Sequence, residues 1–314
     1  MPGRPGARPG RGSSDSEREL GMNLHFASRS FSVAAVLVAS LFALPAIASD
    51  HDDTQLLKDT GRHDARITDF YAFVRDGRLV TAVTMNPTIP VGVSSYVFPD
   101  DLVVRVFIEN NAKVSFDDPV AVALYGGSMA KSEKIKEDVV FEVRFAGGSP
   151  SLATKGLPAW GRAATRLFAG LRDDPFIRGP RIGRNVSAVV IDVPIEAVVR
   201  GRASLVLWAG TEVTGVTGPI ADLGGRALRS QFLENLALND FHPREHESVL
   251  GLPPDVIFVN LRRPIAFPNG RELADDVVDI VADPRILAND MPFPDANDVP
   301  FLSEFPYLAL PQLP

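Results

Sequence analysis

The feature that most constrains the fold is an alternation of apolar and charged residues in two short segments. In residues 139–145 every second residue is Val or Phe, with Glu142 and Arg144 between them. Residues 104–109 repeat the pattern, with valine and isoleucine on one face. A period of two places alternate side chains on opposite faces of an extended chain. Both segments are therefore predicted to be half-buried β-strands.

Three further segments, residues 79–85, 185–193 and 203–209, are rich in Val, Leu and Ile. Residues 204–208 within the last of them are almost continuously apolar, which predicts a strand buried on both faces. Turn-forming pairs fall between the predicted strands, namely Asp76-Gly77, Asn110-Asn111 and Gly147-Gly148. The first two-thirds of the chain is therefore predicted to be an antiparallel β-sandwich.

The pattern changes after about Gly224. Leu228, Phe232 and Leu236 recur at four-residue spacing, and Leu273, Val277 and Ile280 at four and three, which predicts two helices. Twelve of the 26 prolines lie between His242 and Pro314, and proline interrupts regular elements. The fold class is therefore mainly β, an antiparallel β-sandwich with a few C-terminal helices and Pro-rich extended wrapping segments.

The N-terminal region has the order of a secretion signal. Arg29 precedes an apolar run over residues 31–44, and Ala46 and Ala48 supply the small residues that a signal peptidase requires. The run is too short to span a bilayer. A start at Met22 gives a signal of ordinary length, so residues 1–21 are interpreted as an extension or as sequence upstream of the true start. Residues 22–48 are then the signal peptide and 49–314 a single β-rich domain, exported to the periplasm or beyond the cell without a transmembrane anchor.

The charge and the amino-acid composition exclude several classes of binding partner and site. Removal of residues 1–48 leaves 27 basic and 36 acidic residues, a net charge of −9. Nucleic acids and anionic lipids require clustered Lys and Arg, so neither is an expected partner. The chain has no cysteine, which excludes disulfides, thiolate catalysis and Cys-ligated zinc. The core alone must hold the domain together.

Several segments of the mature chain resemble one bacterial family. They are Ser49-Asp50-His51-Asp52, Asp64, residues 67–73, 137–145 and 168–176, Asn269-Gly270-Arg271 with residues 275–279, and residues 305–309. In this order they resemble the family called domain of unknown function 4331. The resemblance implies an exported bacterial protein and carries no catalytic assignment. The chain departs from the family pattern after His51, where a proline is usual, and at residues 111–136, which replace a shorter Asn/Asp-rich turn; if that turn holds a cation, this chain has lost it.

The junction after Ala48 suggests a metal site. A mature terminus Ser49-Asp50-His51 offers an amine, two amide nitrogens and an imidazole, which together suit square-planar Cu(II) or Ni(II). The alternative is a terminus anchored to the sheet by Asp50 and His51. A second hypothesis gathers Asp50, His51, Asp52, His63, Asp64 and Asp69 around a divalent metal ion. Against it, Asp69 has the position of a residue that caps the first strand.

Two acidic segments raise the possibility of hydrolysis. Arg172, Asp173 and Asp174 precede Pro175-Phe176, and Asp275, Asp276 and Asp279 follow about a hundred residues later. Glycoside cleavage uses two carboxyl groups on either side of the bond. Adjacent residues of an extended chain point in opposite directions, so the pair would combine one aspartate from each segment. The alternative is a structural turn in which aspartates accept backbone N–H groups and Arg172 forms an internal salt bridge.

Two weaker motifs have simpler explanations. His242 and His246 share a face if the segment is helical, as in zinc sites, but Pro243 favours an exposed helix start. Gly126-Gly127-Ser128 follows a predicted apolar strand, residues 120–125, and approximates a nucleophile elbow or, with Lys131, an S-x-x-K motif. A flexible polar loop is the alternative there. The sequence thus favours a non-enzymatic exported domain with a binding or structural role, whose partner would be a metal ion, a small molecule, a glycan or the cell envelope. A cell-envelope or extracellular hydrolase using paired aspartates is the second hypothesis.

Overall fold

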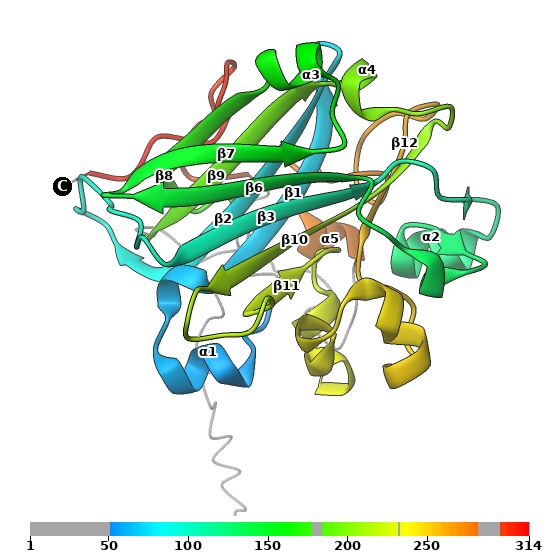
Figure 1. Ribbon diagram of the computed structural model, residues 1–314, viewed down its shortest axis with the longest axis horizontal. Helices are drawn as coiled ribbons and strands as arrows, with labels where there is room; N and C mark the ends of the chain where they lie inside the picture. Colours follow the sequence, from blue (N-terminus) through cyan, green and yellow to red (C-terminus); the bar gives the residue numbers. More distant parts are fainter. Residues whose placement is uncertain (1–50, 178–183, 232, 282–295, 314) are drawn as a thin grey trace, which may run out of the picture. The chain divides into compact units, whose positions relative to one another are not determined.

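The computed structural model describes residues 51–177, 184–231, 233–281 and 296–313. Pro45–Pro314 form a compact unit of their own. Two antiparallel sheets pack face to face, as Figure 1 shows, which confirms the predicted mainly β fold. Sheet A has the strand order β1 (Ile67–Arg75), β2 (Arg78–Pro90), β9 (Arg184–Pro194), β8 (Arg166–Asp173).

Sheet B forms the second layer. Its order is β11 (Asp222–Gly224), β10 (Ser204–Val213), β3 (Leu102–Glu109), β6 (Val139–Ala146), β7 (Ser149–Lys155). A further strand, β12 (Ile257–Asn260), pairs with the first half of β10, whereas β11 pairs with its second half. A two-stranded ribbon, β4 (Val114–Ser115) with β5 (Ser128–Met129), lies apart from both sheets.

Short helical elements connect the strands. The α-helices are α1 (Gln55–Thr60), α2 (Pro119–Tyr125), α3 (Ala159–Ala163), α4 (Ile195–Val198) and α5 (Val277–Val281). The 3-10 helices are η1 (His63–Ala65), η2 (Ser132–Lys134), η3 (Arg229–Gln231), η4 (Leu233–Asp240) and η5 (Pro243–Glu245), and η6 (His246–Leu250) is a π-helix. Within the described part of the chain, no helix has the length and apolar character needed to cross a membrane.

The core lies between the two sheets, where the alternating segments turn their apolar faces. Val104 and Val106 of β3 and Phe141 and Val143 of β6 are buried in one cluster with β1, β2 and β9. Their charged neighbours point outward and pair with one another across the strands. Burial of apolar surface in this layer is the main stabilising contribution to the fold.

Strand β10 is buried on both faces, as its continuous apolar sequence predicted. Leu205 and Leu207 enter the core between the sheets. Val206 and Trp208 pack on the other side against Phe258 of β12. The insertion between β3 and β6 also contributes to this second cluster, so β10 is covered by sheet A on one side and by connecting segments on the other.

The outer face of sheet A is covered as well. Tyr71, Phe73 and Val80 pack against Tyr307 and Leu308 from the C-terminal segment. Ring centroids of Phe73 and Tyr307 lie 6.0 Å apart in an edge-to-face arrangement. The broader expectation of Pro-rich wrapping segments stays a prediction, because part of that stretch, residues 282–295, lies outside the described residues.

The helix predicted over Leu228 to Leu236 takes the 3-10 form where the structure describes it; Phe232 lies outside the described residues. Leu228 has φ 65°, a left-handed conformation that no α-helix continues through. The segment instead forms the 3-10 helices η3 and η4. In the second predicted helix, α5 begins only at Val277, so Leu273 precedes it.

The predicted strand over residues 120–125 is a helix, α2. Asp118 accepts a hydrogen bond from the backbone N–H of Val120 at 2.9 Å, and Pro119 occupies the first helical position. Gly126 ends the helix with φ 76°. Six consecutive apolar residues carry no period of their own, so these local end signals decide between strand and helix.

Candidate functional site

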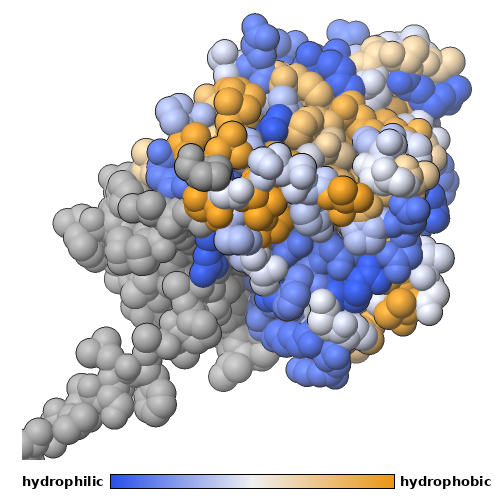
Figure 2. All heavy atoms as spheres, turned by 90° about the vertical axis from the view of Figure 1, so that its left-hand side faces the viewer, coloured by the Kyte–Doolittle hydropathy of each residue, from blue (hydrophilic) through white to orange (hydrophobic). Residues whose placement is uncertain are grey.

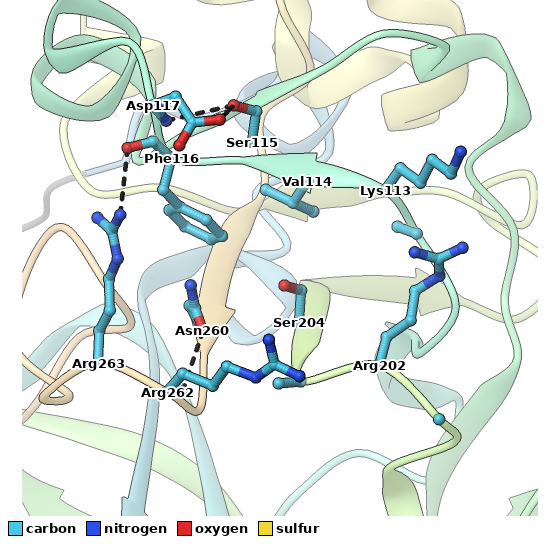
Figure 3. A pocket seen from close by; sticks show the side chains of 13 residues that line it. Lys113, Val114, Ser115, Phe116, Asp117, Arg202, Ser204, Asn260, Arg262 and Arg263 are labelled. Atoms are coloured by element: carbon cyan, nitrogen blue, oxygen red, sulfur yellow. Dashed lines mark hydrogen bonds between the residues drawn. The ribbon is translucent and has the colours of Figure 1, made fainter.

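A basic pocket of about 500 Å³ opens at the end of sheet B where β10 begins and β12 ends. Lys113, Arg202, Arg262 and Arg263 contribute four cationic side chains to its lining, and Asp117 contributes the one acidic side chain among the lining residues. Ser204, Asn260 and the ring of Phe116 complete the surface that Figure 3 shows. The arrangement suits an anionic ligand.

Antiparallel pairing brings one side of the pocket together. Ser204 of β10 lies opposite Asn260 of β12. Arg202 comes just before the first strand and Arg262 just after the second, so both emerge at the same edge of the sheet. The side-chain oxygen of Asn260 accepts the backbone N–H of Arg262 at 3.0 Å, which turns the chain as it leaves β12.

The other side of the pocket comes from the insertion between β3 and β6. Residues 112–117 line it, and the pairing of β4 with β5 holds this stretch in place. Asp117 is tied locally, because Ser115 Oγ lies 3.0 Å from its Oδ2. Residues 111–136, which were predicted to replace a shorter turn of the family that the sequence resembles, therefore include this wall of the pocket.

None of the four cations of the pocket makes an ion pair with any residue of the described ranges, a property that they share with Arg172 and Arg200 elsewhere. Many other arginines contact carboxylates, among them Arg62, Arg66, Arg78, Arg105, Arg166 and Arg271. Arg202 Nε donates to Asn111 Oδ1 at 3.2 Å, and Arg263 lies over the Phe116 ring, 5.2 Å from its centroid. In the view of Figure 3, Ser204 lies between the guanidinium groups of Arg202 and Arg262. An anion there would meet uncompensated positive charge.

His51 is anchored, as one of the two alternatives for the mature terminus predicted. Its Nε2 lies 2.9 Å from Asp222 Oδ1 and its Nδ1 3.3 Å from Ser230 Oγ. The backbone N–H of Asp52 also donates to Ser230 Oγ at 3.0 Å. The imidazole is only 5% exposed, whereas the copper site requires an accessible His51 side chain. Ser49 and Asp50 lie outside the described residues.

Ser230, His51 and Asp222 form a chain of contacts like that of a catalytic triad. Burial argues for a structural role, because Asp222 is fully buried and Ser230 is 1% exposed, so no substrate reaches the hydroxyl. Burial raises the pKa of Asp222 to about 6, against the lowering effect of His51 and of the Ile67 N–H that it accepts. The contacts fix the N-terminal segment to β11 and β1.

The other residues of the predicted divalent-metal site are separated into individual ion pairs. Asp64 accepts two hydrogen bonds from Arg62 at 2.9 and 2.8 Å, and His63 contacts Arg66. Asp69 is buried against Arg271 at 2.9 Å, and Asp52 meets Lys58 at 3.4 Å. Throughout the described ranges, no three His, Asp or Glu side chains gather in a way that could hold a metal ion.

Asp173 and Asp174, the aspartates of the first predicted hydrolytic segment, are buried at the end of strand β8. Asp173 accepts the side-chain amides of Asn297 and Gln312, each at 2.7 Å. Burial raises the pKa of Asp173 to about 7, although the two amides oppose the shift. Asp174 Oδ1 accepts the backbone N–H of Phe176 at 3.2 Å. The expected internal salt bridge of Arg172 is absent from the described contacts; its guanidinium stacks 3.9 Å from the centroid of the Phe168 ring.

The second acidic segment also forms a turn. Asp275 Oδ2 accepts the backbone N–H groups of Phe267 and Glu272 at 2.9 and 2.7 Å. Asp276 Oδ1 accepts the N–H of Asp279 at 3.2 Å, next to the start of α5. Both segments therefore use their carboxylates to satisfy backbone donors and amides, as expected of structural turns.

His242 and His246 do not face a common metal. His242 Nε2 contacts Glu137 at 2.7 Å, whereas His246 contacts the Phe241 carbonyl at 2.8 Å. Burial lowers the pKa of both imidazoles. The predicted exposed helix start is wrong in its exposure, because His246 is buried and His242 partly so.

Ser128 is not a nucleophile elbow, since it follows helix α2 rather than a strand. It lies in β5, opposite Ser115 of β4. Lys131, the last residue of the S-x-x-K match, is exposed. The motif that the sequence offered as a nucleophile site is part of the ribbon that supports the basic pocket.

The cations of the basic pocket are not among the site residues predicted from the sequence. Arg262-Arg263 shortly after the apolar residues 256–259 and Arg202 directly before a predicted strand were the signals available. Comparison with known proteins adds no identification, because no family model, curated protein or solved structure matches the chain. The family resemblance stays a prediction.

Proposed function

We propose that the protein is an exported, non-enzymatic binding domain whose basic pocket holds an anionic group, the phosphate or carboxylate of a small molecule or of a cell-envelope component. The observation that carries the proposal is the convergence of four cations without an acidic partner in a chain of net charge −7. Many arginines elsewhere are neutralised by acidic residues in ion pairs. At the pocket this neutralisation is left to a ligand.

The chemistry of the lining supports a specific ligand over diffuse attraction. Three guanidinium groups offer planar, paired donors, which match the geometry of a carboxylate or phosphate. Ser204 and Asn260 add neutral hydrogen-bonding groups, and the Phe116 ring supplies an apolar surface for the rest of the ligand. A few polar groups beside an aromatic surface are typical of small-molecule sites.

Binding is favoured over hydrolysis by the state of the aspartates. A glycosidase requires two carboxyl groups at the scissile bond. The carboxyl group of Asp173 is occupied by two amides, and Asp275 accepts two backbone N–H groups. Export is supported by the apolar run at residues 31–44 with Ala46 and Ala48 after it, and by the absence of cysteine.

The test is calorimetric titration with inorganic phosphate and with glucuronate at low ionic strength, and glucose serves as the neutral comparison. We expect the charged probes to bind and glucose not to. The double variant Arg202→Gln/Arg262→Gln should weaken binding at least tenfold, because hydrogen bonds to charged groups contribute about 1.5–3 kcal/mol each. Lys155→Gln on β7, exposed and outside the pocket, is the control for the loss of positive charge. Equal binding by the double variant and the wild type would contradict the proposal.

A further inference from the structure

We propose that helix α2 and the adjoining basic pocket form a docking surface for an anionic phospholipid membrane. The inference rests on the proposed function, since it assigns the anion of the pocket to a lipid headgroup. Lys113, Arg202, Arg262 and Arg263 would contact the phosphates, and the exposed face of α2 would enter the apolar part of the bilayer. A cluster of this kind overturns the sequence-based expectation that clustered cations are lacking.

Helix α2 is unusual in its composition and exposure. All seven of its residues, from Pro119 to Tyr125, are apolar or aromatic, and none is buried. Val120 is 62% and Leu124 53% exposed. Their four-residue separation places both on one face of the helix. An apolar helix without a buried residue marks an interaction site rather than part of the core.

The exposed face is held in a fixed orientation. Asp118 caps the first turn, and Arg226 donates to the carbonyl oxygen of Ala123 at 2.7 Å in the last one. Gly126 and Gly127, which follow the helix, have no room for a side chain: a β-carbon on Gly126 would lie 3.0 Å from the Pro268 carbonyl oxygen. These contacts fix the position of α2, so its apolar side chains stay exposed to solvent.

The cations of the pocket lie near helix α2, at the same end of the sandwich. Helix α2 directly follows the pocket wall at Phe116 and Asp117, and Figure 1 shows α2 and the β4–β5 ribbon at one end of the sandwich. Lys131, after β5, adds a further exposed charge. Asp117 and Asp118 are the nearest carboxylates in sequence, and Ser115 and a helical N–H engage them. Apolar residues beside clustered cations are the combination that binds anionic lipid surfaces.

A second, apolar hollow favours a lipid over a free anion. It has a volume of about 290 Å³ and lies along the ribbon, with Val114, Met129 and Ala130 in its lining. Lys113, Val114 and Ser115 belong to both hollows. One molecule with a charged headgroup and a hydrocarbon chain would satisfy both, whereas inorganic phosphate would leave the second empty.

The experiment is co-sedimentation of residues 45–314, which form a compact unit, with vesicles of phosphatidylcholine alone or mixed equally with phosphatidylglycerol. We expect binding to the anionic vesicles that weakens at high salt, and at least tenfold weaker binding for Val120→Glu/Leu124→Glu and for Arg202→Gln/Arg262→Gln. The matched control is Val97→Glu/Leu310→Glu, which adds the same charge at two other exposed apolar residues. They belong to the segment between β2 and β3 and to the C-terminal segment, which lie at the end of the molecule opposite to α2 in Figure 1. Figure 2 shows this end, where apolar and hydrophilic residues are interspersed.

Each contrary outcome has a distinct meaning. Binding of free phosphate or glucuronate without binding of anionic vesicles overturns the membrane inference and leaves the proposed function intact. Equal binding to neutral vesicles, or no effect of the α2 variant, also overturns it. If the chain dimerises in sedimentation equilibrium and Val120→Glu/Leu124→Glu abolishes the dimer, the apolar face belongs to a second copy and the inference fails. Thermal melting of each variant verifies that the fold is retained.

Discussion

Nε2 of His51 lies 2.9 Å from Oδ1 of Asp222, so a buried pair joins the start of the described chain to strand β11, 171 positions later. Replacing His51 with alanine leaves the Asp222 carboxyl buried with the Ile67 N–H as its described donor. Losing one member of a buried pair costs about 3 kcal/mol. We expect His51→Ala to lower the free energy of unfolding by that amount in urea titrations at pH 7.

The control for this prediction is His63→Ala. His63 is exposed and contacts Arg66, so its removal should change stability by less than ~0.5 kcal/mol. A double-mutant cycle between His51→Ala and Asp222→Asn isolates the pair. Strict additivity of the two changes would show that the contact contributes nothing.

Asp173 makes stability depend on pH. Its folded pKa of about 7 lies above the ordinary value of 3.8, so the folded protein keeps a proton that the unfolded chain releases between these values. The contribution of Asp173 to the free energy of unfolding is therefore fully present below pH 4. It falls by at most ~4 kcal/mol as the pH rises to 7. We expect Asp173→Asn to remove this dependence of stability on pH. The measurement is the melting temperature of the wild type minus that of the variant, which should fall between pH 4 and 8.

Asp222 titrates in part of the same window and with the same sign, since burial raises its pKa to about 6. Because this group is present in both proteins, the difference between wild type and Asp173→Asn reports Asp173 alone. A difference that stays constant across the pH range would refute the assignment.

Two glycines of the β6–β7 region test backbone geometry. Gly156 has φ +81°, and a β-carbon there would lie 1.9 Å from the carbonyl oxygen of Asp138. Gly147 has φ +55° with open space around it. We expect Gly156→Ala to cost about 3 kcal/mol, from strain and backbone displacement, and Gly147→Ala about 1 kcal/mol, from the left-handed conformation alone. Similar losses in chemical denaturation would contradict this order.

Arg226 tethers the insertion to the body of the protein. It donates to the Ala123 carbonyl oxygen and lies 4.4 Å from the centroid of the Phe267 ring, and burial lowers its pKa to about 9. We expect Arg226→Met to leave the sheets folded and to speed tryptic cleavage at Lys131 about tenfold, because the local opening free energy falls by ~1.4 kcal/mol.

Arg200→Met provides the comparison for tryptic cleavage. Arg200 is exposed and donates to the Gly156 carbonyl oxygen, away from the insertion. If both variants are cleaved at the same rate, or if Arg226→Met unfolds the whole domain, Arg226 is not a local tether.

The strands were predictable because their side-chain pattern repeats the geometry of a sheet. In residues 139–145 the period of two specifies both the element and its buried face. Residues 120–125 have no such period, and the caps at Asp118 and Gly126 determined the helix instead. The positive φ of Leu228 breaks a helical pattern that the sequence alone supports. Local patterns thus succeed only where no end signal or backbone exception overrides them.

The candidate site was less predictable, because tertiary pairing creates it. Arg202 and Arg262 are sixty positions apart, and only the opposition of Ser204 and Asn260 brings them to one edge. The anchoring role of His51 was foreseeable as an alternative, whereas its partner Asp222 was not. Asp173 was a plausible catalytic residue, but it accepts hydrogen bonds from the side-chain amides of Asn297 and Gln312 in the C-terminal segment, and the sequence did not indicate these partners.

The segment between β3 and β6, which forms one wall of the pocket, affects both the pocket and the packing of the domain. Ile108 of β3 is already paired with Val139 of β6, so residues 110–138 add nothing to the hydrogen bonding of the two sheets. The segment nevertheless packs on the sandwich, because Ala112 and Ile135 are buried in the cluster that covers the outer side of β10. A loop that replaced it would have to supply equivalent apolar contacts, while the arginines at the ends of β10 and β12 would stay in place. Residues 110–138 therefore combine a wall of the pocket with part of the packing of sheet B, so that a change made for the ligand also acts on stability.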